Sequence, residues 1–226
     1  MKKFTFFAEA AYFVGLLLIC IGASFMTIAD FGVSTVMAPA YTLYLKLSQI
    51  WPWFTLGTSE YALQIALVII MAIVMRKMNI AYCFCFFTAV FYGKLLDLTR
   101  FSMSWIPTGV MWIRVVCYIL GLIFSAAGVA FVFNTYLSPE VYEMFVKELS
   151  GRFGIKIPVF KTGFDCVFAA TAIIMSFVFF GFGKFRGVNV GTVICALVNG
   201  SIIGWFSDLY DRIFDFKDGL KLRRYF

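Results

Sequence analysis

Histidine is absent from this sequence of 226 residues, and only 14% of the residues are charged. Without histidine the chain has no Ser–His or Cys–His nucleophile pair, no histidine metal site and no histidine proton relay. Soluble domains usually contain about 25% charged and about 45–50% apolar residues. Here 62% of the residues are apolar, which is more than a soluble domain of this length can bury, so we expect lipid to surround the chain. The composition excludes a soluble enzyme and a disordered chain.

Motifs for a nucleotide or a metal are also missing. No Gly-x-x-x-x-Gly-Lys-Ser/Thr loop is present to hold a nucleotide. Cys83 and Cys85 are separated by one residue, which is the wrong spacing for a zinc knuckle. All six cysteines lie in apolar runs, namely Cys20, Cys83, Cys85, Cys117, Cys166 and Cys195. We expect them to be packing residues, and we expect no cofactor, no bound metal and no enzymatic activity.

Six apolar segments predict an all-α, polytopic transmembrane bundle. An apolar helix needs about 20 residues to cross the hydrocarbon layer. The segments cover residues 12–28, 61–75, 80–98, 110–133, 164–181 and 188–206.

The basic residues lie between these segments, and the net charge is +7. This scatter favours contact with anionic lipid over nucleic acid. Most of the 19 lysines and arginines fall on one side if six segments cross. The positive-inside rule then places both termini in the cytoplasm. Residues 212–226 are predicted to form a basic amphipathic tail on that surface.

Two links between the segments carry helix-start signals. Residues 33–49 begin with Ser34-Thr35, and residues 138–149 begin with Ser138-Pro139-Glu140. Serine at an N-cap, followed by proline at the first helical position, is a strong local start. The pattern predicts two short helices and leaves open whether they are interfacial or re-entrant.

The two halves of the chain resemble each other, which predicts a repeat of residues 1–106 in residues 107–211. The matched pairs, in the same order in both halves, are Gly15 with Gly121, Gly22 with Gly128, Asp30 with Asn134, Ser34 with Ser138, Gly57 with Gly163, Gly93 with Gly204 and Asp97 with Asp208. Close helix crossings are expected at Gly15, Gly22, Gly121, Gly128, Gly200 and Gly204. Because each half has three crossings, the second half is inverted in the membrane. Inverted repeats are typical of secondary transporters, which bind solutes at the repeat interface.

The repeated motifs resemble those of the YczE/YitT-like bacterial integral membrane proteins. They are the runs Asp30-Phe31-Gly32-Val33-Ser34-Thr35, Arg76 to Asn79, Gly93 to Asp97, Leu137-Ser138-Pro139, Lys161-Thr162-Gly163-Phe164-Asp165 and Gly187-Val188-Asn189-Val190-Gly191-Thr192, followed by Gly200 and Gly204. The resemblance covers nearly the whole chain. It implies this fold in the cytoplasmic membrane of a bacterium and implies no particular activity. The second half keeps the family features, whereas Thr35 stands where proline is usual in the first half.

Polar side chains within apolar segments are the candidates for binding a solute. Gln64 and Asn199 cannot be satisfied by their own helix, so helix association and ligand binding both remain open for them. The helix starts at Ser34, Ser138 and Thr192 offer backbone N–H groups that bind anions, or they are ordinary caps. The predicted substrate-binding residues are Asp30, Ser34, Thr35, Gln64, Asn134, Ser138, Asn189, Thr192 and Asn199.

Acidic residues near the segment ends are candidates for coupling or ion pairing. Glu60 and Asp165 occupy matching places, and Lys161 lies four residues before Asp165, which is a helical ion-pair spacing. Simple ion pairs and coupling to a cation or proton both remain open. The predicted set is Glu60, Asp97, Lys161, Asp165 and Asp208.

The expected function is secondary transport of a small zwitterionic or anionic solute. Ser34 and Ser138 approach each other only if the short helices dip into the membrane, where Asp30 and Asn134 would frame one cavity with them. The alternative is a non-transporting membrane module that binds a partner protein or lipid. The expected partners are membrane lipid and a small solute, and a homo-oligomer is compatible with the sequence.

Overall fold

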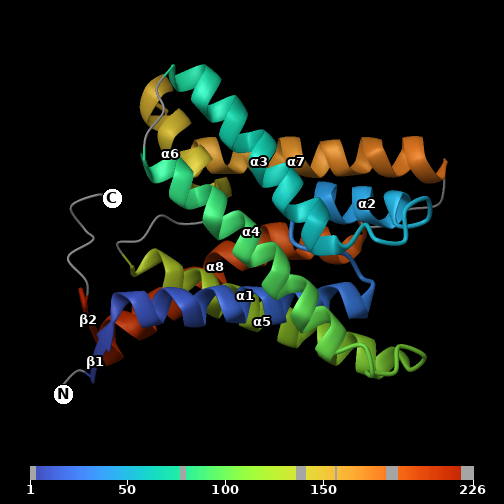
Figure 1. The fold of residues 1–226 in the computed structure, drawn as a ribbon. Coiled ribbons are helices and arrows are strands. Elements are labelled where there is room, and N and C mark those ends of the chain that lie inside the picture. Colours follow the sequence, from blue (N-terminus) through green and yellow to red (C-terminus); the bar gives the residue numbers. More distant parts are fainter. Residues whose placement is uncertain (1–3, 77–79, 136–140, 156, 182–187, 220–226) are drawn as a thin grey trace.

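The computed structural model describes residues 4–76, 80–135, 141–155, 157–181 and 188–219. The elements in chain order are β1 (Phe4–Phe7), α1 (Ala8–Ala29), α2 (Ala38–Leu47), α3 (Leu56–Met75), α4 (Ile80–Ser102), α5 (Met111–Phe133), α6 (Val141–Phe153), α7 (Ile157–Phe180), α8 (Val190–Ile213) and β2 (Phe214–Lys217). Figure 1 shows α1, α5 and α7 running along one direction of the molecule, with α3 and α4 crossing them obliquely.

The prediction of a helical membrane protein is confirmed at the level of its helices. Within the described residues, five helical spans are long and apolar enough to cross a membrane: Ala8–Ala29, Leu56–Met75, Met111–Phe133, Val159–Phe180 and Val190–Ile213. Helix α4 has 23 residues, or about 34 Å at 1.5 Å per residue, and carries Lys94, Asp97 and Arg100 toward its end. It is not among the five, so its crossing stays a prediction.

The two short helices lie toward opposite ends of the molecule (Figure 1). Helix α2 has 10 residues and α6 has 13 residues, which correspond to about 15 and 20 Å. Both are shorter than the roughly 30 Å hydrocarbon layer. Helix α2 packs on α3 and α7, and α6 packs on α7 and α3. Each short helix thus contacts a long helix from both halves of the chain.

Glycines allow α1 and α5 to cross in direct contact. A Cβ atom on Gly15 would lie 2.9 Å from the carbonyl oxygen of Gly128. A Cβ atom on Gly22 would lie 2.7 Å from the carbonyl oxygen of Gly121. The sequence prediction that these four glycines mark a close crossing is confirmed, because any side chain there would collide with the opposite backbone.

Adding a side chain at this crossing should destabilise the protein. In Gly128→Ala the new Cβ would meet the carbonyl oxygen of Gly15 at 2.6 Å. Overpacking of this kind costs about 1–3 kcal/mol, so we expect a lower midpoint of thermal unfolding in detergent. Gly151→Ala in α6 is the matched control, because nothing lies within 4 Å of its Cβ position. Equal midpoints for the two variants would contradict the close crossing.

The second and third long helices of the two halves, α3 with α4 and α7 with α8, differ in how closely they pack. Helix α3 packs along α4, and a Cβ on Gly93 would lie 2.7 Å from the carbonyl oxygen of Gly57. In the part of the chain that the structure describes, α7 and α8 have no comparable contact. Nothing lies within 4 Å of the Cβ positions of Gly163 and Gly204, which match Gly57 and Gly93 in sequence. The same holds for Gly200, so the close crossing expected at Gly200 and Gly204 is not present among the described residues. The α3–α4 pair is therefore in close contact, and the α7–α8 pair is apart.

A small two-stranded sheet joins the two ends of the described chain. Strands β1 and β2 pair in parallel, with Phe4 opposite Phe214 and Phe6 opposite Phe216. The composition of residues 212–226 predicts a basic amphipathic tail. Within this segment, α8 continues to Ile213 and residues 214–217 form β2, and residues 220–226 lie outside the described residues. Apolar and polar residues alternate in Phe-Asp-Phe-Lys, which suits a strand with one buried face, and β1 and β2 lie together at one end of the molecule (Figure 1).

Candidate functional site

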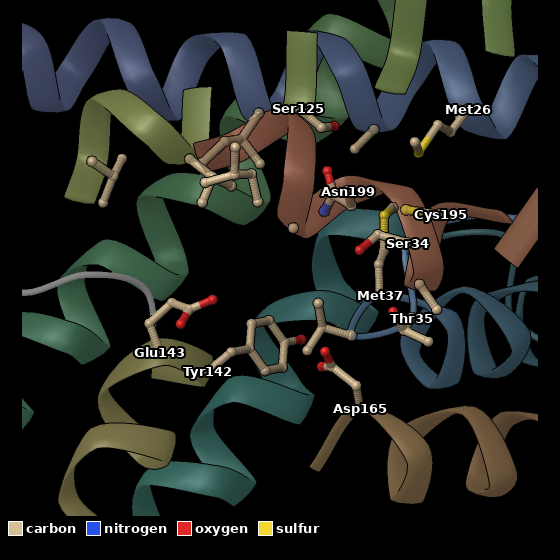
Figure 2. A pocket seen from close by; sticks show the side chains of 18 of the residues that line it. Met26, Ser34, Thr35, Met37, Ser125, Tyr142, Glu143, Asp165, Cys195 and Asn199 are labelled. Carbon is tan, nitrogen blue, oxygen red and sulfur yellow. The ribbon is translucent and has the colours of Figure 1, made fainter. Parts of the chain in front are cut away.

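A cavity of about 340 Å³ lies in the interior of the bundle (Figure 2). This volume is within the range of small-molecule sites, which is about 300–1,000 Å³. Helices α1, α5 and α8 line one side, and α3, α6 and α7 line the other, together with the segment before α2. The polar lining residues are Ser34, Thr35, Glu60, Tyr92, Ser125, Tyr142, Glu143, Lys161, Asp165, Cys195 and Asn199. Six of the sequence candidates are therefore brought together: Ser34, Thr35, Glu60, Lys161, Asp165 and Asn199.

Both short helices begin beside this cavity. Ser34 and Thr35 lie just before α2, where the amides of Met37 and Ala38 donate to the Ser34 carbonyl oxygen at 3.1 and 2.9 Å. Tyr142 and Glu143 lie in the first turn of α6. Figure 2 shows Tyr142 and Asp165 facing Asn199 and Ser34 across the cavity. The starts of α2 and α6 thus meet at one site although the two helices lie toward opposite ends of the molecule.

A buried carboxylate joins α3 to α6. Glu60 is only 1% exposed, and the Tyr142 hydroxyl donates to its Oε1 at 2.8 Å. Because a buried carboxylate is costly without hydrogen bonds, this contact helps to hold Glu60 in the lining. Ser59 donates to the carbonyl oxygen of Ala40 at 2.6 Å and fixes the start of α3 against α2.

The lysine of the cavity is held by a residue that sequence reasoning missed. Lys161 Nζ donates to Glu143 Oε1 at 2.6 Å, and both side chains are half-buried. The spacing of Lys161 and Asp165 predicts an ion pair within one helix, and Glu143 on α6 is a further partner of Lys161. In the sequence, Glu143 is only an acidic residue in the first turn of a predicted helix. The helix dipole favours an acid at that position, so the residue gave no sign of a role in the cavity.

The cavity lining has more acidic than basic groups. Among the described residues, Glu60, Glu143 and Asp165 line it with Lys161 as the basic side chain. Asn199 adds a buried Oδ1 that has no hydrogen-bond partner in the described part of the protein. An unsatisfied buried acceptor costs about 1–3 kcal/mol, so a ligand that donates a hydrogen bond would be favoured there.

Gln64 and Thr192 are buried outside the cavity lining. Neither amide atom of Gln64 has a partner among the described residues, nor does the hydroxyl of Thr192. Thr192 lies against Gly32, whose φ of +107° and close approach to α8 both require glycine. The Gly191 amide donates to the Phe31 carbonyl oxygen at 2.8 Å, so the turn after α1 sits on the start of α8.

Three other candidates serve as helix caps. Asn189 Oδ1 accepts from the Val190 amide at 2.9 Å and caps α8. Asn134 Nδ2 donates to Ala130 O at 3.0 Å and to Ser207 Oγ at 3.3 Å at the end of α5. Asp97 accepts from the Gly57 amide at 2.8 Å and from the Thr55 hydroxyl, so it caps α3 from α4.

The remaining candidates lie away from the cavity or outside the described residues. Asp208 is exposed on α8. Asp30 faces Arg114 at 3.5 Å in a second cavity. Ser138 lies outside the described residues. Of the four residues expected to frame one cavity, Ser34 alone lines it among those described.

These features define a helical, multi-pass membrane protein with an internal polar cavity. The chain belongs to the DUF6198 family, a family of unknown function, whose profile matches residues 6–208. No curated protein and no solved structure matches the chain.

Proposed function

We propose that this protein is a secondary transporter of a small zwitterionic solute that carries an ammonium group. The observation that carries the proposal is the polar cavity between the two halves of the chain. In the first half the α3–α4 pair is closed, whereas in the second half the α7–α8 pair is apart. The proposal includes six crossings, two inverted repeats and both termini in the cytoplasm of a bacterial inner membrane. A relation to the YczE/YitT-like proteins belongs to the same proposal.

The helix contacts support inverted repeats. Suppose that α1 to α4 correspond to α5 to α8, so that Gly15 corresponds to Gly121 and Gly22 to Gly128. The contact between Gly15 and Gly128 then corresponds to the contact between Gly121 and Gly22, and a two-fold axis requires both contacts. The packing of α2 on α7 likewise corresponds to that of α6 on α3, and α1 on α4 to α5 on α8. Among the described elements, α3–α4 and α7–α8 break this correspondence.

The broken correspondence supports transport rather than static binding. In inverted-repeat transporters, the two repeats exchange conformations so that a central site opens to each side in turn. In this proposal, the closed α3–α4 pair and the open α7–α8 pair represent the two conformations that each repeat adopts in turn. The opposite state would close α7 on α8 at Gly163 and Gly204 and separate α3 from α4.

The charge of the lining favours a zwitterion over an anion. A solute ammonium group would bind the carboxylates of Glu60 and Asp165 through charge-assisted hydrogen bonds. Its acidic group would face Lys161 and the helix start at Ser34. Asp165 and Glu60 are also the residues on which coupling to a proton or cation would depend.

A stability screen followed by uptake tests the proposal. A ligand at 100 times its Kd stabilises a protein by about 2.7 kcal/mol, so unlabelled amino acids and betaines should raise the unfolding midpoint of the purified protein. Each compound that does so is then tested for uptake into proteoliposomes. We expect saturable uptake above that of empty liposomes.

The same assay separates the alternative module from a transporter. A non-transporting module would bind lipid or protein and show no uptake of any stabilising compound. Simple anions that stabilise the protein as strongly as zwitterions would contradict the proposed solute class.

A further inference from the structure

A second cavity, of about 400 Å³, lies at the end of the bundle away from the paired strands. It is bordered by the ends of α1 and α4, the start of α5 and the side of α2. Two arginines, Arg100 and Arg114, and one acid, Asp30, line it among the described residues. The cavity shares none of its lining with the central cavity.

Arg114 is fixed by the protein itself. Its Nε donates to the Ala29 carbonyl oxygen at 2.8 Å, and its Nη2 lies 3.5 Å from Asp30 Oδ2. The guanidinium group also stacks on Phe31, 4.8 Å from the ring centre. Arg114 therefore secures the end of α1, and the exposed Asp30 carboxylate is its ion-pair partner.

Arg100 is held in place without being neutralised. Its guanidinium carbon lies 4.4 Å from the ring centre of Tyr44, and the side chain is half-buried. In the described part of the protein, no carboxylate lies within ion-pair distance of it. A half-buried guanidinium that is oriented by an aromatic ring, and that keeps its hydrogen bonds available, is suited to bind an anion.

Hydroxyl groups complete the lining. Tyr41 is buried, and burial raises the pKa of its hydroxyl to about 12, so it is protonated and able to donate at neutral pH. Ser104 and Thr108 add two hydroxyls from the link between α4 and α5. Several donors around one cation suit an anion with three or four oxygen atoms better than a carboxylate with two.

Exposed tryptophans place this end of the bundle at the height of lipid headgroups. Trp105 and Trp112 are 79% and 75% exposed and lie on either side of Thr108 in sequence. Tryptophan is enriched where hydrocarbon meets headgroups. The cavity mouth is thus within reach of phospholipid phosphates as well as of dissolved phosphate.

We propose that this second cavity binds a phosphate group between Arg100, Arg114 and the hydroxyl of Tyr41. The bound group is the phosphate of an anionic lipid headgroup or of a dissolved phosphate compound. The proposal does not depend on transport by the central cavity.

Two probes distinguish the sources of the phosphate. The purified protein in an uncharged detergent is titrated with inorganic phosphate at constant ionic strength, and separately with phosphatidylglycerol. The unfolding midpoint gives an apparent Kd for each. Hydrogen bonds to charged groups contribute about 1.5–3 kcal/mol, so Arg100→Gln should weaken binding by about tenfold or more. Lys94→Gln removes the same charge from an exposed site on α4 and should bind as the wild type does.

Tyr41→Phe keeps the ring and removes the hydroxyl, so it tests the site even if Arg100→Gln does not fold. We expect a several-fold loss of affinity, because one hydrogen bond to an ion is lost. Binding of phosphatidylglycerol alone would support a lipid headgroup, and binding of both probes would support the phosphate group in either source. The proposal is overturned if neither probe binds, or if Tyr41→Phe and a folded Arg100→Gln both bind like the wild type.

Discussion

Replacing Gly204 with leucine should reduce uptake by about 5- to 150-fold while leaving the unfolding midpoint of the protein unchanged. Nothing lies within 4 Å of the Cβ position of Gly204, so the structure accommodates the new side chain. The opposite state would bring Gly204 against Gly163, as Gly93 meets Gly57 here. A side chain in that contact costs about 1–3 kcal/mol, which lowers the population of the closed state about 5- to 150-fold. Proteoliposome uptake and thermal unfolding measure the two effects separately.

Two variants accompany this experiment. Gly151→Leu in α6 also adds leucine where nothing lies within 4 Å, and it should change neither property. Gly93→Leu meets the closed α3–α4 contact and should lower the unfolding midpoint. Wild-type uptake by Gly204→Leu would show that α7 and α8 do not close at this position, and the proposed exchange of conformations would fail.

Asp165→Asn should reduce uptake by about tenfold to a hundredfold. The substitution keeps the size of the side chain and removes one carboxylate of the cavity that would bind the solute ammonium group. A hydrogen bond to a charged group contributes about 1.5–3 kcal/mol, which corresponds to that range. Initial uptake rates at several solute concentrations would separate weaker binding from slower transport.

Asp218→Asn is the control for this substitution, because Asp218 is exposed and lies near the C-terminus, outside the cavity lining. Uptake by Asp218→Asn should equal that of the wild type. Unchanged uptake in both variants would show that Asp165 is an interfacial acid without a role in the solute site.

Helix positions follow closely from the apolar pattern. The segment 110–133 became α5 from Met111 to Phe133. The segment 164–181 became α7, which starts earlier, at Ile157. Lys161 therefore lies on the helix, where it lines the cavity. In the sequence, a polar residue such as Lys161 marks the end of an apolar run. The helix can nevertheless continue through it where that residue faces a polar interior.

The composition of the site followed only partly from the sequence. Glu60, Asp165 and Asn199 were identifiable because polar groups are costly in apolar segments. Tyr142 and Glu143 were not, because α6 reaches Glu60 and Lys161 only through the folding of distant segments. The cavity at Arg100 was missed for the same reason, since its aromatic support comes from Tyr44 on α2.

If the two halves are inverted repeats, as proposed above, the packing of α6 on α3, and of α2 on α7, has an evolutionary consequence. Each half uses its short helix to complete a surface of the other half. A half-length ancestor that inserted in both orientations would form these same contacts between two separate copies, as an antiparallel homodimer. Fusion of two such genes would then free each copy to diverge, and residue pairs such as Asp30 and Asn134 would be traces of that divergence.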